Sequence, residues 1–550
     1  MNGNPSKYPS GPSALDTTLW RDPTPPPRRV LEMSEGRVLD PESAITLPGV
    51  KPFSTVYVGP RLIISTLFDV GTLFAHLSEV AFELGWTITP DRGTDVPAPQ
   101  RRRRAAAKVR SAAQSPIGVI GVNLAVAEGN EKAVQAPDGW ALLQQARARF
   151  GIEEMRGVGL DHVVFLRPGM WGPNPGMWGP NPGMWGPNGT DMPIVSYMFP
   201  GSGGREPVAY VGPRPHRRSD KEIKGRRPVV AVLDTGCGTH PWLDGVVKTD
   251  VKLDGAAIGY FDDQTNPEIY PDQVGPLDGA IDPYSGHGTF ICGLIHQACP
   301  DADIIAWRVV DSAGPIRESA LIQALTDILT LVERHAADPK TGQAIDVLNL
   351  SLGYYHETPE DTLVDPTVWE IMRRFGAAGT TVVCSAGNDA TARPMFPAAF
   401  APWADGKGPI PPDPSAIPIV SVGALNPSGA SDALFSNAGP WVRVYDYGAA
   451  VVSTLPIDFE GGLLPTARSE AYQRVRESID PDNYTGGFAV WSGTSFAAPL
   501  FAGRLAHRLG EELTRRPPNE AATSTKRRAW NALVELTDMK PSELRGAAGS

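Results

Sequence analysis

The pattern of apolar and polar residues predicts a first folded unit over residues 56–167. Apolar side chains recur at helical spacing from Leu73 to Leu84, and residues 138–150 form a second amphipathic stretch. Short apolar runs that are typical of strands lie around these helices, at 61–66, 86–89, 117–122 and 162–166. The order strand–helix–strand, strand–helix–strand predicts a small ferredoxin-like α+β domain.

From residue 227 to residue 540 the pattern becomes that of an α/β domain. Nearly continuous apolar runs at 229–233, 345–350 and 381–384 are typical of buried parallel strands. An amphipathic helix lies between the first two runs, at 321–332. This alternation predicts a doubly wound parallel sheet with helices on both faces, and functional groups are then expected at the carboxyl ends of its strands.

The other segments lack the pattern of a folded core. Residues 1–55 are rich in Pro and Ser and are expected to form a mostly disordered arm. Residues 168–226 are predicted to be a Pro/Gly-rich linker in which Gly-Met-Trp-Gly-Pro-Asn occurs three times. Its prolines exclude a helix, and its exposed tryptophans could dock a partner. Residues 541–550 are expected to be a C-terminal tail.

Two groups of arginines fall in or between these segments. Arg101–Arg104 separate the two halves of the first unit and are expected in a solvated loop, with a processing site as the alternative. Arg217-Arg218 and Arg226-Arg227 are expected to continue the linker as a basic stretch that proteases can reach.

The composition limits the classes of binding partner and the cellular compartments that we expect. The 550 residues carry a formal net charge of −11, which argues against nucleic acid as a partner. No apolar run reaches the roughly 18 residues that span a bilayer, and no secretory signal follows Met1. We therefore expect no membrane association and a cytoplasmic protein, with non-classical export left open. Four cysteines are expected to be buried free thiols: Cys237, Cys292, Cys299 and Cys384.

Polar residues with complementary chemistry follow the predicted strands. Asp234 directly follows the strand at 229–233, and Ser385-Ala-Gly-Asn388 follows the strand at 381–384. His287 lies between two glycines, just before an apolar stretch that is predicted to be helical. Ser495 lies where another helix is expected to begin, and the positive end of a helix stabilises developing negative charge.

Together these residue types suit acyl transfer. A serine hydroxyl is a weak nucleophile until an imidazole takes its proton, and the imidazole needs a carboxylate to fix its tautomer. We therefore assign Ser495 as the nucleophile, His287 as the general base and Asp234 as its orienting acid. Asn388 and the backbone N–H of Ser495 are predicted to hold the oxyanion. Each motif alone is weak, since a helix cap, a core histidine or a turn asparagine explains it equally well.

These segments resemble the subtilisin-like serine peptidases, or subtilases, over roughly 227–540. The matching motifs are Val-Leu-Asp-Thr-Gly, Gly-His-Gly-Thr, Ser-Ala-Gly-Asn and Gly-Thr-Ser-Phe-Ala-Ala-Pro, in the order Asp, His, Ser. Asn349-Leu-Ser-Leu-Gly353 resembles the substrate-binding strand of the family. The resemblance implies that substrate contacts come from Ser351, Leu352, Gly353, Ala386 and Gly387. Phe496 and Asp446-Tyr-Gly448 depart from the family pattern, which leaves the details of the pocket open.

The resemblance implies an endopeptidase that acts on proteins or peptides without a cofactor. Residues 56–167 resemble a subtilase propeptide, which implies an intramolecular inhibitor that autoprocessing in the linker releases. Structural calcium is common in the family, but no residues are assigned to it and no metal ligand is predicted. Asp-Thr-Gly also occurs in aspartic proteases, but no second copy of such a site is present. The alternative hypothesis is a latent protease that acts mainly as a binding or adaptor module, through the tryptophan repeats.

Overall fold

The structure is a computed structural model of the chain. It describes residues 22–23, 25–48, 50–91, 96, 117–129, 135–166, 197, 203–260, 262–277, 279–312, 314–359 and 366–541. Arg101–Arg104, the tryptophan repeats and residues 542–550 lie outside the described residues.

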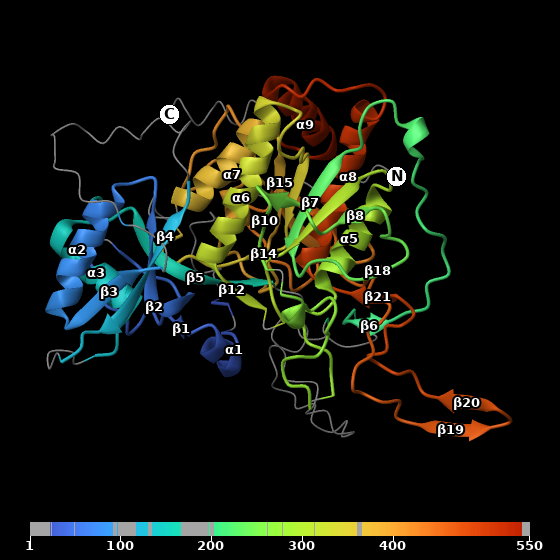
Figure 1. The fold of residues 1–550 in the computed structure, drawn as a ribbon, viewed down its shortest axis with the longest axis horizontal. Helices are drawn as coiled ribbons and strands as arrows, with labels where there is room; N and C mark the ends of the chain where they lie inside the picture. Colours follow the sequence, from blue (N-terminus) through green and yellow to red (C-terminus); the bar gives the residue numbers. More distant parts are fainter. Residues whose placement is uncertain are drawn as a thin grey trace.

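The first folded unit is an antiparallel sheet with two helices, drawn in blue and teal in Figure 1. Its strands lie side by side in the order β5, β2, β4, β3. A shared apolar core joins the sheet to both helices, with Leu62, Leu77 and Leu142 at its centre. The elements are β2 (Val56–Ser65), α2 (Val70–Glu83), β3 (Trp86–Pro90), β4 (Val119–Val126), α3 (Gly139–Phe150) and β5 (Val158–Leu166).

Part of the predicted disordered arm is ordered in the structure. Residues 28–38 form α1 (Arg28–Met33) and β1 (Gly36–Val38), and β1 pairs antiparallel with β2. Val30 packs against Val58 and Phe165, so this segment buries apolar surface on the first unit. The prediction of disorder was wrong for these residues, because their contacts are with strands distant in the sequence.

The basic pairs of the predicted linker lie against the second unit. Arg218 and Arg226 form ion pairs with Asp301 and Asp346, at 2.7 and 2.6 Å. Arg217 pairs with Asp303. The described part of the predicted linker also contains β6 (Glu206–Pro207), which pairs with β21 (Phe488–Trp491), and the 3-10 helix η4 (Asp220–Glu222). Acidic residues outside the linker therefore neutralise these basic side chains. Access of proteases to the stretch stays a prediction.

The second unit is built on a sheet whose neighbouring strands are all parallel, as predicted. The strand order is β17 (Val444–Tyr447), β16 (Val420–Leu425), β15 (Thr381–Ser385), β13 (Val347–Leu350), β7 (Val229–Asp234), β11 (Asp303–Arg308) and β8 (Val247–Lys248). One face packs on α6 (Glu318–Ala337) and α7 (Pro366–Ala378). The other packs on α5 (His287–Ala298), α8 (Thr494–Leu513) and α9 (Ala522–Leu536). The helices therefore cover both faces of a doubly wound sheet (Figure 1).

Short elements surround this sheet. They are β9 (Lys252–Leu253), β10 (Ala256–Ala257), η5 (Asp263–Thr265), η6 (Ala398–Phe400), β18 (Val451–Thr454) and β21 (Phe488–Trp491). A hairpin of β19 (Arg468–Ala471) and β20 (Arg474–Glu477) projects away from the rest of the molecule (Figure 1). Within the described part of the chain, no helix is long and apolar enough to cross a membrane.

Strand β5 connects the two units. Besides pairing with β2, it pairs antiparallel with β12 (Pro315–Arg317) and with β14 (Leu352–Gly353) of the second unit. Val164 and Leu166 of β5 belong to the same apolar cluster as Leu350 and Leu352. The sheet of the first unit therefore continues onto the surface of the second.

Candidate active site

The fold brings Asp234 and His287 into direct contact. Asp234 is the last residue of β7, and His287 is the first residue of α5. The Nδ1 atom of His287 lies 2.7 Å from Oδ1 of Asp234, and both side chains are fully buried. The same Oδ1 accepts the backbone N–H of Thr235 at 2.8 Å. A carboxylate held in this way fixes the orientation and the tautomer of the imidazole.

The other side of the His287 ring faces the segment that carries Ser495. The ring packs against Trp491 and Phe496, with centroid distances of 5.7 and 5.2 Å. Its Nε2 atom is buried and makes no hydrogen bond with the described residues. Ser495 is the second residue of α8, so the predicted helix start is confirmed. Phe496, one of the departures from the family pattern, thus packs directly on the histidine.

Ser495 also contacts the predicted substrate strand. Its Oγ lies 3.4 Å from the backbone oxygen of Ser351, a long hydrogen bond. In return, Oγ of Ser351 donates a hydrogen bond to the backbone oxygen of Ser495 at 2.9 Å. The predicted nucleophile and the start of the substrate strand are therefore joined by reciprocal contacts.

Asn388 lies beside the same helix start. Its side-chain oxygen accepts the backbone N–H and the hydroxyl of Thr494, at 2.9 and 2.8 Å. Since the carboxamide is planar, its NH₂ group is directed away from Thr494. A Cβ atom added to Gly493 would come within 3.5 Å of that nitrogen. The two contacts with Thr494 therefore fix the orientation of the amide that was predicted to hold an oxyanion.

Ala386 and Gly387, the other predicted substrate contacts, follow β15 and are held by Asn437. The side-chain NH₂ of Asn437 donates to the backbone oxygen of Ala386 at 2.9 Å. The backbone N–H of Asn437 donates to the backbone oxygen of Gly387, also at 2.9 Å. Gly387 has a φ of 101°, and a Cβ there would lie 2.5 Å from the Asn437 nitrogen. Only glycine suits this position, which has both a left-handed backbone and no room.

A segment of the same chain lies on the predicted substrate strand. Leu352 and Gly353 pair in register with Leu166 and Phe165 of β5. On its other edge, β5 pairs with β12, where Ile316 lies opposite Val164. Strand β5 therefore lies between two strands of the second unit and pairs with both. An extended peptide binds to a sheet edge by the same kind of strand pairing.

Glu268, a buried carboxylate next to this site, was not predicted from the sequence. It accepts hydrogen bonds from the hydroxyls of Thr235 and Thr289 and from the backbone N–H of Gly288. Burial raises the pKa of Glu268, and the threonine hydrogen bonds oppose the shift. Glu268 thereby links the residue after Asp234 to the first turn of the helix that carries His287. It lies in a loop without periodic pattern, so its place in the sequence gave no signal.

Side chains suited to hold a metal lie apart from these residues. Among the described residues they form one group, His162, His356 and Glu357. Cys292, Cys299 and Cys384 are buried free thiols, as predicted, and Cys237 is a partly exposed one.

Comparison with known proteins shows that the chain is similar to members of one family. Residues 225–535, more than half of the chain, match the sequence profile described as "Subtilase family". The intracellular serine protease of Paenibacillus polymyxa is 28% identical over 301 residues, which cover 52% of this chain and 67% of that protein. The major intracellular serine protease of Bacillus subtilis is 26% identical, over 45% of this chain and 66% of that protein.

Two further matches extend the comparison. Serine protease AprX of Bacillus subtilis is 26% identical over 52% of this chain and 58% of its own length. The chain thus spans about two thirds or less of these relatives. Among solved structures, fervidolysin from Fervidobacterium pennivorans aligns with 85% of this chain and 56% of its own, at 18% identity and a TM-score of 0.42.

Proposed function

This chain belongs to the subtilase family of serine peptidases, and on that premise we propose that it is an endopeptidase whose nucleophile is Ser495. In the first step Oγ of Ser495 attacks the carbonyl carbon of a peptide bond, while Nε2 of His287 takes the hydroxyl proton. The tetrahedral intermediate then collapses, and His287 gives this proton to the leaving amine. Water hydrolyses the acyl-enzyme by the same two proton transfers.

The remaining residues lower the barrier without taking up the proton. Asp234 orients His287 and stabilises the imidazolium that forms. The Asn388 amide and the backbone N–H of Ser495 donate to the oxyanion, and each such donor is worth about 3 kcal/mol. The observation that carries this proposal is the buried pair of Asp234 and His287 at 2.7 Å, packed against the segment 491–496.

The first unit is proposed to inhibit this site until it is cleaved from the chain. Residues 56–167 are assigned as a ferredoxin-like, propeptide-like domain, which the strand order β5, β2, β4, β3 supports. The pairing of β5 with Leu352 and Gly353 supports the inhibition, because a substrate cannot add to a strand that is already paired. Release would follow cleavage within residues 168–226.

The names of the relatives support a cellular setting. Two of them are called intracellular serine proteases. We propose that this chain also acts on protein or peptide substrates inside the cell, and cell fractionation with an antibody against the chain would test this.

Casein hydrolysis by the purified full-length chain tests the activity. We expect the wild type to cleave casein, Ser495→Ala to lose at least about 1,000-fold of the rate, and Ser469→Ala, an exposed serine on β19, to match the wild type. Equal rates for Ser495→Ala and the wild type would exclude Ser495 as the nucleophile. If neither the full-length chain nor a 227–550 fragment has activity, and a partner is captured through residues 168–190, the adaptor hypothesis is favoured.

A further inference from the structure

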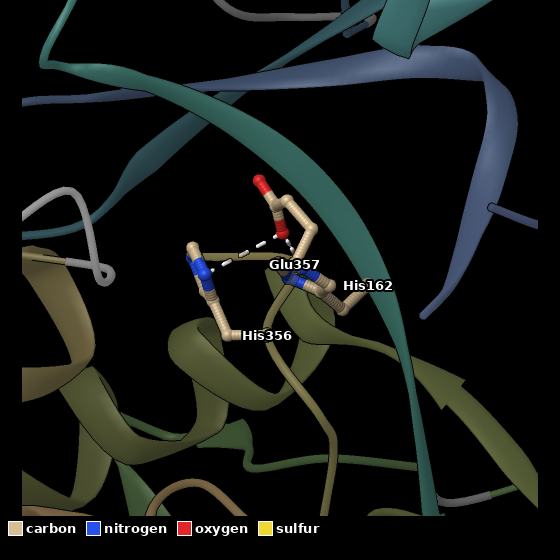
Figure 2. A group of neighbouring side chains, drawn as sticks. All are labelled: His162, His356 and Glu357. Atoms are coloured by element: carbon tan, nitrogen blue, oxygen red, sulfur yellow. Dashed lines mark hydrogen bonds and ion pairs between the residues drawn. The ribbon is translucent and has the colours of Figure 1, made fainter. Parts of the chain in front are cut away.

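A buried group of two histidines and a glutamate lies where the two units meet (Figure 2). His162 comes from β5 of the first unit, whereas His356 and Glu357 follow β14 of the second. The side chains of His162, His356 and Glu357 are 2, 5 and 1% exposed. The serine peptidase mechanism proposed above uses none of these residues.

The potential ligand atoms converge on one point. The Nε2 atom of His162 lies 2.8 Å from Oε2 of Glu357, and Nδ1 of His356 lies 3.5 Å from the same oxygen. One ligand atom from each residue lies within 4.8 Å of the other two. Both contacts meet at a single carboxylate oxygen in Figure 2. Ligands of a tetrahedral zinc ion, about 2.0 to 2.2 Å from the metal, are spaced in the same range.

A second carboxylate supports one of these ligands from behind. Oε2 of Glu318 lies 2.5 Å from Nδ1 of His162, on the opposite side of the ring from Glu357. The other oxygen of Glu318 accepts the hydroxyl of Tyr354 at 3.0 Å. Histidines that bind metals usually donate their second N–H to a carboxylate, which fixes the ring and increases its basicity.

The hydrogen bonding of His356 suits a metal ligand. Its Nδ1 atom accepts the backbone N–H of Thr358 at 3.0 Å, so this nitrogen carries no proton. A histidine nitrogen binds a metal only in this unprotonated form.

We propose that His162, His356 and Glu357 bind a divalent transition metal such as Zn²⁺, with Glu318 as the carboxylate that orients His162. Two imidazoles and one carboxylate select a borderline metal over Ca²⁺ or Mg²⁺, which prefer oxygen ligands. Metal binding would displace the proton between Nε2 of His162 and Glu357. It would also replace the hydrogen bond from the Thr358 N–H to Nδ1 of His356.

Such an ion would link the two units, because each unit supplies at least one of its ligands. His162 lies four residues before Leu166, and His356 lies four residues after Leu352, so the ion would lie beside the paired strands β5 and β14. Its effect on activity rests on the proposed function, since only an inhibitory first unit makes this link a control on catalysis. Zinc would then keep the enzyme latent, and a chelator would release it.

Cobalt titration of the full-length Ser495→Ala chain tests the site, because this variant cannot process itself. After removal of metals with EDTA, we expect added Co²⁺ to give the visible absorption of a tetrahedral site, saturating near one equivalent. Zn²⁺ should then abolish that absorption by displacing Co²⁺. His356→Gln should lose the absorption, and Glu318→Gln should weaken Zn²⁺ binding by about 10- to 100-fold. His507→Gln, an exposed histidine on α8, should titrate like the parent.

The absence of visible absorption in the parent chain would overturn the proposal. Identical titrations of the parent, His356→Gln and Glu357→Gln would overturn it as well, and would leave the proton of His162 as the link between the units. The readout does not depend on peptidase activity, so failure of the metal site and failure of the proposed function remain distinguishable. Cobalt binding without any effect of zinc on casein hydrolysis by the wild type would instead count against the inhibitory role of the first unit.

Discussion

We propose that Glu268 positions the pair formed by Asp234 and His287, because its hydrogen bonds reach the neighbours of both residues. It accepts from Thr235, which follows Asp234, and from Gly288 and Thr289 in the first turn of α5. A carboxylate at a helix N-terminus satisfies donors that the helix leaves unpaired. Its own hydrogen bonds are therefore expected to affect the distance between the acid and the base.

Removal of Glu268 should lower both stability and catalysis. In Glu268→Ala the buried donors of Thr235 and Thr289 lose their acceptor, which should cost about 2 to 4 kcal/mol of unfolding free energy. Glu268→Gln keeps one acceptor oxygen and should recover much of the stability. Urea unfolding in the Ser495→Ala background measures the loss of stability. In the catalytically active chain, a lower kcat at an unchanged KM measures the loss of catalysis. A kcat equal to the wild type in a folded Glu268→Ala would exclude the positioning role.

Asp446 should make stability depend on pH. Burial raises its pKa to about 6, although the ion pair with Arg504 at 3.0 Å opposes the shift. A raised pKa in the folded state means that this carboxyl stabilises the fold only when protonated. Its contribution is complete below about pH 4 and is lost as the pH rises through 6. We therefore expect Asp446→Asn to be more stable than the parent by about 2 to 3 kcal/mol at pH 8.

Urea unfolding at several pH values, again in the Ser495→Ala background, checks this prediction. The difference between Asp446→Asn and its parent should shrink to nearly zero at pH 4. A constant difference from pH 4 to pH 8 would contradict the argument, since a residue that does not titrate gives no pH dependence.

At the scale of elements, β5 carries the proposed inhibition. Leu166 at its end is fully buried, and it belongs to the apolar cluster that contains Leu350 and Leu352. An aspartate there would place a charge among apolar side chains, so Leu166→Asp should weaken docking by at least about 3 kcal/mol, or roughly 100-fold. Peptide hydrolysis by the full-length variant should therefore be faster than by the wild type.

A matched control lies in the same unit. Val126 at the end of β4 is 49% exposed, so Val126→Asp should leave the rate of the wild type unchanged. Equal rates for Leu166→Asp and the wild type would mean that β5 does not restrict access to the site.

Local pattern explains which elements the sequence could predict. The helices α2, α3 and α6 and the strands β7, β13 and β15 have their own periodicity or continuous apolar runs, and all are present. The pairing of β5 with β12 and β14 depends on partners about 150 to 190 residues away and leaves no periodic signal. The same reason hid α1 and β1, whose stability comes from contacts with β2 and β5.

The candidate site was predictable to the extent that its motifs are local. Asp234, His287, Asn388 and Ser495 each occur in a short segment with recognisable neighbours, and their order along the chain indicated the family. Glu268 and the His162 group have no such segment, because their neighbours in space come from distant loops and strands. Hydrogen bonds across the fold bring the neighbours of Glu268 together, and contacts of histidines with carboxylates bring the His162 group together.

At the scale of the whole molecule, cleavage of the chain should allow the two units of the wild type to separate. If the enzyme processes itself within residues 168–226, the wild type should accumulate a shorter band and Ser495→Ala should remain full length. Electrophoresis with N-terminal sequencing of the product checks this. Identical full-length bands for both chains would remove autoprocessing from the account.

The most direct test of the central claim is the position at which a fluorophosphonate reacts. We would label full-length Leu166→Asp, in which the site should be open, and locate the modified residue by mass spectrometry. We expect a single modification, on Ser495, and no labelling of Leu166→Asp/Ser495→Ala. Modification of another serine, equal labelling of both chains, or no labelling of either would contradict the assignment of Ser495 as the nucleophile.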